Sequence, residues 1–190
     1  MRTTLLIQIM AAITRAVWAL FEFVRLRREV RQPHNDLDKH SAQLWDVAIA
    51  LEVIGMLFGF FGIGSMHGVP NVFAPIGLVV MILGIVIRWS AIRTLGRYFT
   101  GKVLIQPGHQ LIRVGLYKYV RHPAYTGSLV AHAGLGLSFS NWLTLGLSIV
   151  PFVIAVWYRM RVEDAALQKG LGVAYLDYSK EVKRLIPKLY

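Results

Sequence analysis

Five apolar runs most constrain what this chain of 190 residues can fold into. A helix that crosses a membrane needs roughly 20 mostly apolar residues. The pattern therefore predicts an all-α integral membrane protein with about five transmembrane helices. The last two runs are short and closely spaced, so we expect a tight helical hairpin that is either tilted or not fully spanning. The runs cover residues 4–24, 45–66, 72–92, 125–139 and 143–158.

The composition excludes an ordinary soluble domain. Only 16% of the residues are charged, whereas soluble domains average about 25%. The chain has no cysteine, which excludes disulfides, thiolate metal sites and a cysteine nucleophile. A net charge of +11 in a soluble protein would suggest nucleic acid. Because the charges here lie between apolar runs, we expect contact with membrane lipids, no nucleic acid, and one domain over residues 1–190.

The basic residues predict an orientation in the membrane. Nineteen of the 21 Lys and Arg residues fall in the segments 25–43, 88–124 and 159–190. A five-span arrangement puts these three segments on one side, and short loops rich in Lys and Arg stay in the cytoplasm. The N-terminus is then outside and the C-terminus inside. An alternative with four spans and a re-entrant last hairpin separates the basic segments, so we favour five.

Ionisable side chains interrupt the apolar runs. Such residues are costly in lipid and should face the bundle interior or the interfaces. Asp46 and Glu22 lie near run ends and suit an interface. Arg15 and Glu52 are deeper and can pair across the first two helices, for a structural or a functional purpose. His132, in the fourth run, can likewise have a structural role in packing or a functional role.

Glycines recur along the apolar runs. Small residues let helix backbones approach closely in lipid, so we expect these positions to mark helix–helix contacts. They are not by themselves a dimer signal, and no oligomeric state is predicted. The glycines in question are Gly55, Gly59, Gly77, Gly84, Gly127, Gly134 and Gly136.

The segment from Tyr98 to Tyr125 is too polar to span a membrane. Pro107-Gly108 is a turn signal, and short apolar strips at 103–105 and 110–112 flank it, which suggests a small hairpin against the membrane face. Proline favours the first turn of a helix, so Pro123 is expected to start the fourth helix.

A second polar cluster follows the fifth run. Arg159 and Glu163 are spaced i, i+4 on a helix that continues that run, so they share a face. Taken alone, such a pair is usually a surface salt bridge. Gly170 is expected to end this helix. The tail at 180–188 is basic and suits an anionic membrane surface.

Several common sites are missing from the sequence. There is no GxGxxG after a strand and no Walker motif. His109 and His122 have no carboxylate close by in the sequence, so we expect no metal site.

The two polar clusters together form one long pattern of residues. Its first part is Gly115, Tyr117, Arg121, His122, Pro123, Tyr125 and Gly127. Its second part is Arg159, Glu163, Asp164, Leu167, Gly172, Tyr175 and Tyr178. This pattern resembles the isoprenylcysteine carboxyl methyltransferase family, in particular its short prokaryotic or archaeal members. The resemblance covers roughly residues 98–187, the expected catalytic region, and phospholipid N-methyltransferases share a weaker version of it.

The resemblance implies S-adenosylmethionine as the methyl donor and a prenylcysteine carboxylate as the acceptor, with the active site at the cytoplasmic membrane face. It implies Glu163 as a cofactor contact and Arg159 as the residue at the substrate carboxylate. Asp164 departs from the pattern, because many relatives have a second glutamate there. The other implied cofactor contacts are His109, Gln110, Leu111, Ile112, Tyr117, His122, Pro123, Ala124 and Tyr125.

The implied chemistry needs no general base, because a carboxylate is already ionised at neutral pH. The protein then has to position the reactants and keep water away. A guanidinium at Arg159 can hold a carboxylate through two parallel hydrogen bonds. Two alternatives stay open on the sequence: a phospholipid or amine-lipid N-methyltransferase, and a small membrane scaffold without catalysis.

Overall fold

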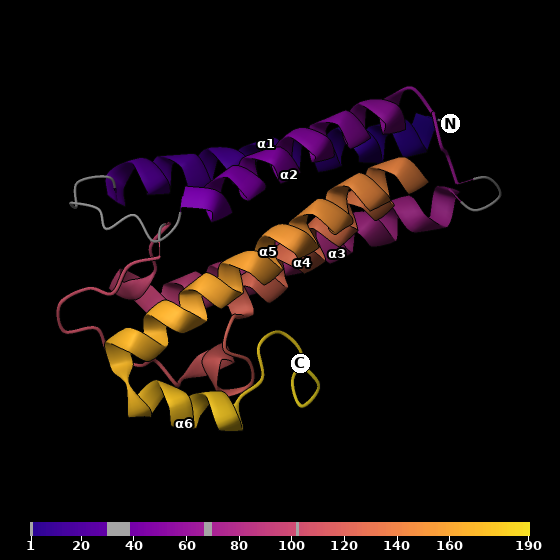
Figure 1. Cartoon of the computed structure of the whole chain (residues 1–190). Helices are drawn as coiled ribbons and strands as arrows, with labels where there is room; N and C mark the ends of the chain where they lie inside the picture. Colours follow the sequence, from indigo (N-terminus) through magenta and orange to yellow (C-terminus); the bar gives the residue numbers. More distant parts are fainter. Residues whose placement is uncertain (1, 30–38, 67–69, 102) are drawn as a thin grey trace.

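The computed structural model describes residues 2–29, 39–66, 70–101 and 103–190. Long helices form a bundle, and a short helix follows near the C-terminus (Figure 1). No β-strand forms within the described residues, so the prediction of an all-helical chain is confirmed. The elements are α1 (Arg2–Glu29), α2 (Lys39–Phe60), α3 (Pro70–Leu95), the 3-10 turns η1 (Gly96–Tyr98) and η2 (Gly115–Lys118), α4 (Pro123–Ser138), α5 (Trp142–Leu171) and α6 (Val173–Glu181).

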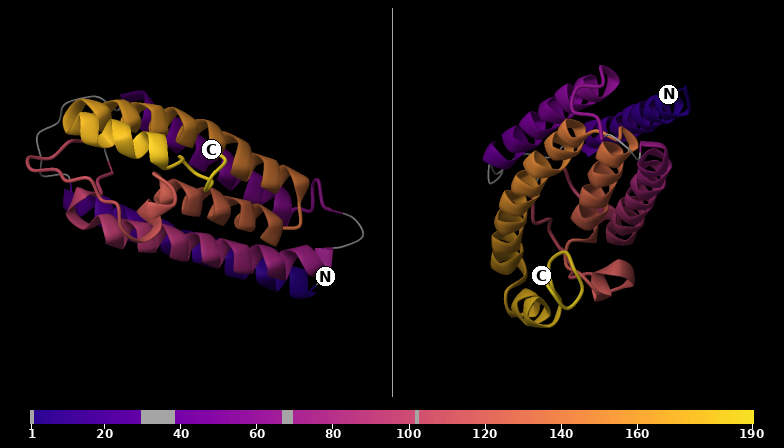
Figure 2. Two further views of the ribbon diagram at one scale, coloured as in Figure 1. Left: turned by 90° about the horizontal axis from the view of Figure 1, so that it is seen from below. Right: turned by 90° about the vertical axis from the view of Figure 1, so that its right-hand side faces the viewer.

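Four of the helices, α1, α2, α3 and α5, are long and apolar enough to cross a membrane. Helix α4 has 16 residues and so is about 24 Å long, short of the roughly 30 Å of a bilayer core. The predicted count of about five spans is therefore not confirmed, and α4, from the expected short hairpin, is the helix that falls short. Figure 2 shows α4 between α3 and α5, with α1 and α2 on another side of it.

Glycines bring α3 and α4 into backbone contact. A Cβ at Gly84 would lie 2.3 Å from the backbone nitrogen of Ala131, and one at Gly134 would lie 2.2 Å from that of Met81. The glycines at 77 and 127 are equally crowded. The expectation that small residues mark helix contacts is confirmed here. This close contact holds α4, whose first residues belong to the site, in a fixed place on α3.

Two helix ends differ from the sequence-based expectation, and a glycine accounts for each. Helix α2 ends at Phe60 rather than at the end of the apolar run, because Gly62 and Gly64 adopt φ angles of 72° and 83°. Helix α5 runs past Gly170 and ends before Gly172, whose φ is 58°. Glycine takes such a left-handed conformation without steric penalty.

The tight turn expected between the last two apolar runs forms as predicted. Asn141 is the N-cap of α5, and its side chain accepts a hydrogen bond from the backbone N–H of Thr144 at 3.0 Å. Its amide nitrogen donates to the carbonyl of Ile63 at 2.7 Å. The cap therefore also fastens the turn to the segment that follows α2.

A charged cluster, Arg15–Glu52–His132, lies inside the bundle. Arg15 Nε donates to Glu52 Oε2 at 2.8 Å, which confirms the predicted pair across the first two helices. Glu52 is fully buried and also contacts Nδ1 of His132. The imidazole of His132 stacks on Phe152 with ring centroids 3.5 Å apart. The cluster thus links α1, α2, α4 and α5.

One end of the bundle collects the polar segments of the chain. The last residues of α1, α3 and α5 and the first residues of α2 and α4 lie there, together with η1, η2 and α6 (left side of Figure 1). The N-terminus lies at the opposite end. The described parts of the three basic segments therefore come together at a single end, which is where the candidate site is found.

Candidate active site

An open cavity lies at this end of the bundle. Its walls come from the segment after η1, from η2, from the start of α4, from the last turns of α5 and from α6. Apolar and aromatic side chains with a few polar groups make up its lining, as is typical of small-molecule sites.

Almost all of the site residues expected from the sequence line this one cavity, although they come from segments up to 54 positions apart. The exception is Pro123, which is buried as the first residue of α4. The expected residues in the wall are His109, Gln110, Leu111, Ile112, Tyr117, His122, Ala124, Tyr125, Arg159 and Glu163.

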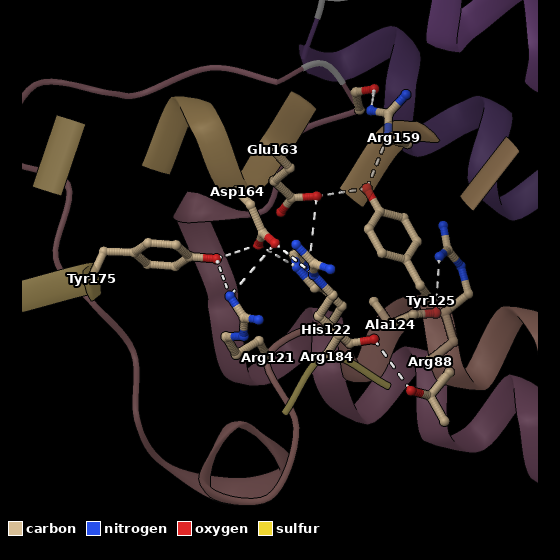
Figure 3. A network of polar contacts seen from close by, with 12 residues as sticks. Arg88, Arg121, His122, Ala124, Tyr125, Arg159, Glu163, Asp164, Tyr175 and Arg184 are labelled. Atoms are coloured by element: carbon tan, nitrogen blue, oxygen red, sulfur yellow. Dashed lines mark hydrogen bonds and ion pairs between the residues drawn. The ribbon is translucent and has the colours of Figure 1, made fainter. Parts of the chain in front are cut away.

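The hydroxyl group of Tyr125 joins Arg159 to Glu163 (Figure 3). Arg159 Nε donates to this hydroxyl at 2.9 Å, and the hydroxyl donates to Glu163 Oε2 at 2.7 Å. Arg159 is only 9% exposed and also donates to Ser41 Oγ at 3.3 Å and to the carbonyl of Gly101. Arg159 and Glu163 are thus parts of a cavity wall. They do not form the surface salt bridge that their helical spacing alone suggests.

The imidazole of His122 lies between two carboxylates. Its Nε2 is 2.8 Å from Asp164 Oδ1, and its Nδ1 is 3.9 Å from Glu163 Oε2. The sequence offered no carboxylate near His122, because both acids lie about 40 positions further along the chain. No group of three His, Asp or Glu side chains in the described part of the chain could hold a metal ion.

The start of α4 is braced from behind by Arg88 of α3. Its Nη1 donates to the carbonyl of Ala124 at 3.3 Å and to Ser128 Oγ at 2.9 Å. Its Nε donates to Glu22 of α1 at 2.8 Å. Glu22 is therefore paired within the bundle, and three helices jointly fix the turn that carries Tyr125.

Tyrosines form a second wall of the cavity. Burial raises the pKa of Tyr178 to about 12, and burial with the nearby Glu163 raises the pKa of Tyr117 as well. Burial and then the charge of Asp164 raise the pKa of Tyr175. These phenols stay protonated at neutral pH and act as donors: Tyr178 donates to the carbonyl of Tyr117 at 2.6 Å.

His109 closes the cavity from the segment after η1. Its ring stacks on Tyr98 with centroids 4.6 Å apart. Its Nδ1 is buried and makes no hydrogen bond. Burial lowers the pKa of His109, and the charge of Glu163 opposes this effect. The turn before His109 forms, with its N–H on the carbonyl of Gln106 at 3.0 Å, but the expected hairpin strands do not.

Sequence reasoning missed some residues that shape the site. Tyr98, Arg121, Tyr175 and Tyr178 line the cavity, and Asp164 contacts His122 behind its wall. The pattern behind the family resemblance contains Arg121, Asp164, Tyr175 and Tyr178, but it implies no cofactor or substrate contact for them. Tyr98 had no signal beyond its place at the start of the polar segment.

Residues 76–169 match the isoprenylcysteine carboxyl methyltransferase family. Protein-S-isoprenylcysteine O-methyltransferase A of Arabidopsis thaliana is 35% identical over 157 residues, which are 80% of this chain and 75% of the relative. Protein-S-isoprenylcysteine O-methyltransferase of Tribolium castaneum is 31% identical over 156 residues, or 78% of this chain and 53% of the relative.

A solved structure, that of a eukaryotic intramembrane Ras methyltransferase, superposes with a TM-score of 0.64. The two chains are 28% identical, and the match covers 80% of this chain and 54% of the other. The fold and these relatives define a helical membrane methyltransferase. The chain belongs to the isoprenylcysteine carboxyl methyltransferase family.

Proposed function

We propose that the chain transfers a methyl group from S-adenosylmethionine to the carboxylate of a C-terminal prenylated cysteine, or of a similar lipid-like acid, at the cytoplasmic membrane face. The observation that carries this proposal is the Arg159–Tyr125–Glu163 arrangement in the wall of one cavity. It puts a buried cation and a carboxylate on either side of one hydroxyl group in the same wall, where a carboxylate acceptor and a cationic methyl donor can each meet its opposite charge.

The cavity lining fits S-adenosylmethionine. Glu163 and His122 offer hydrogen-bond acceptors for its ammonium or ribose groups, and Tyr117 and Tyr98 offer aromatic faces for its adenine. The buried Nδ1 of His109, which has no partner, is a polar atom that a ligand can satisfy, as buried polar groups generally require. When bound, this cofactor supplies an activated methyl group on a sulfonium centre.

Arg159 is the residue we assign to the acceptor carboxylate. Its guanidinium is buried at the point where α5 leaves the apolar part of the bundle. A planar guanidinium recognises a carboxylate through two parallel bonds, and a lysine cannot copy that geometry. The acceptor is already ionised, so Arg159 has to orient it and no base has to deprotonate it.

The membrane side is testable because the chain has no cysteine. Phe61 is 77% exposed at one end of the bundle, and Tyr119 is 63% exposed beside the site. In sealed vesicles of known orientation, we expect Tyr119→Cys to react from the cytoplasmic side and Phe61→Cys from the other. The reverse labelling pattern would reject a cytoplasmic active site.

The decisive experiment is methyl transfer by the purified protein in lipid nanodiscs. Labelled S-adenosylmethionine is offered with S-farnesylcysteine, with S-geranylgeranylcysteine and with an aminophospholipid. We expect base-labile methyl ester on the prenylcysteines alone. Methylation of the amine lipid instead would favour a lipid N-methyltransferase, and no cofactor binding at all would favour a scaffold.

A further inference from the structure

Asp164 is the most highly connected carboxylate near the cavity (Figure 3). Its Oδ1 contacts His122 Nε2 at 2.8 Å and also accepts a hydrogen bond from the hydroxyl of Tyr175. Its Oδ2 accepts from Arg184 Nε at 2.9 Å and lies 3.5 Å from Arg121 Nη1. One side chain on α5 thus holds the start of α4, helix α6 and the C-terminal tail together.

His122 is fixed on its backbone side as well. Its N–H donates to the carbonyl of Arg184 at 3.0 Å, and the preceding N–H, of Arg121, donates to that of Lys183 at 2.7 Å. The imidazole is 3% exposed. The ring therefore has little freedom to turn, and the groups at its two nitrogens decide what it can offer to a ligand.

The two nitrogens of His122 face different partners. A carboxylate only accepts hydrogen bonds, so the contact with Asp164 requires a proton on Nε2. In the neutral ring this leaves Nδ1 as an acceptor. Nδ1 is 3.9 Å from Glu163 Oε2, so a ligand donor such as an ammonium group can bond to both acceptors at once.

We propose that Asp164 is a positioning residue of the cofactor site: it acts through His122 by fixing the orientation and tautomer of the imidazole, so that Nδ1 and Glu163 form a paired acceptor. This inference rests on the proposed function for the identity of the ligand. Tyr175 donates to the same oxygen that His122 contacts and Arg184 donates to the other one, and together they keep the Asp164 carboxylate aimed at the ring.

Asp164→Asn is the informative substitution, because an amide keeps the size but can donate as well as accept. It permits the other tautomer, with the proton on Nδ1 facing Glu163. We expect affinity for S-adenosylmethionine to fall about ten- to hundredfold, the range for losing a hydrogen bond to a charged group. Asp164→Glu keeps a carboxylate and should restore much of the affinity. Asp177→Asn, which removes an exposed carboxylate on α6, is the matched control and should bind normally.

The tautomer has a signature that needs no cofactor. With ¹⁵N-labelled histidine, His122 is assigned by its loss in His122→Gln, and the wild type should show a protonated Nε2 and a bare Nδ1. In Asp164→Asn this pattern should change, and in Asp177→Asn it should stay. A wild-type ring with a proton on Nδ1, whether as the other tautomer or as an imidazolium, or no change in Asp164→Asn, would overturn the inference.

A double-mutant cycle tests whether Asp164 acts through His122. Calorimetric affinity for S-adenosylmethionine is measured for Asp164→Asn, His122→Ala and the double variant. We expect the second substitution to add little to the first, since coupled residues are non-additive. Fully additive losses would overturn the inference. If the wild type itself does not bind S-adenosylmethionine, the proposed function fails and the nitrogen spectra alone decide the tautomer.

Discussion

Two clusters built from the same residue types lie at different depths of the molecule. Arg15, Glu52 and His132 meet inside the helix bundle, and none of them lines the cavity. Arg159, Glu163 and His122 meet at the end of the bundle and line it. In the first cluster the charges contact one another directly. In the second, Tyr125 stands between the cation and the carboxylate.

We interpret the first cluster as a structural use of buried charge and, in line with the proposed function, the second as part of a ligand site. Glu52 is fully enclosed and its partners come from two other helices, so the charges neutralise one another and fix helix positions. The Glu163 side chain is 28% exposed toward the cavity. Because the Tyr125 hydroxyl lies between Arg159 and Glu163, the two charges do not pair with each other and stay within reach of a ligand.

The largest expected effect comes from breaking the bundle cluster. Glu52→Ala leaves Arg15 and His132 buried without their carboxylate, and breaking a buried pair in this way costs about 3–5 kcal/mol. We expect a corresponding loss in the free energy of unfolding, measured by denaturation in lipid nanodiscs. Replacing all three residues, as Arg15→Met, Glu52→Leu and His132→Phe, should recover much of that stability. A stable Glu52→Ala protein would show that the cluster has no structural role.

The next effect concerns turnover at the site. Arg159→Lys keeps the charge but loses the planar fork, so methyl transfer to a prenylcysteine should fall by about a hundredfold from misplacement of the acceptor. Cofactor affinity should stay near that of the wild type. Glu163→Gln should weaken both cofactor binding and turnover. Identical binding defects in the two variants would reject this division of roles.

A smaller effect is expected from two residues that line the proposed cofactor site. His122→Ala and Tyr117→Ala each remove a lining side chain, and affinity for S-adenosylmethionine should fall about tenfold, as for one lost hydrogen bond or stacking contact. The helices should remain folded, which circular dichroism will check. Unchanged affinity in both variants would remove these residues from the site.

The smallest effect is a pH dependence of cofactor affinity. Burial lowers the pKa of His109 from its ordinary value near 6.5, and a bound cation disfavours protonation further. Affinity should therefore be constant above about pH 6.5 and fall as pH drops through the lowered pKa. His109→Gln should lessen that fall. A fall that His109→Gln leaves unaltered would show that His109 is not its cause.

The sequence by itself determined which parts of the chain are helical and what kind of chemistry they carry. In lipid, an apolar run of this length is stable as a helix, because a single helix forms all of its backbone hydrogen bonds internally. Local signals also placed the turn at Asn141, the helix start at Pro123 and the pair between Arg15 and Glu52. Each depends on neighbouring residues or on the high energy of an isolated charge in the bilayer.

Only the tertiary structure decided which carboxylates contact the two buried histidines His122 and His132. The contact of Asp164 with His122 spans 42 positions, and that of His132 with Glu52 spans 80. Neither contact follows from helical spacing in the sequence. Both depend on how α4 packs against its neighbours, which the glycines of α3 and α4 determine. The sequence paired Arg159 with Glu163 by helical spacing, but the fold brought Tyr125 between them from another helix. That insertion separates the charges and leaves both of them on the cavity wall.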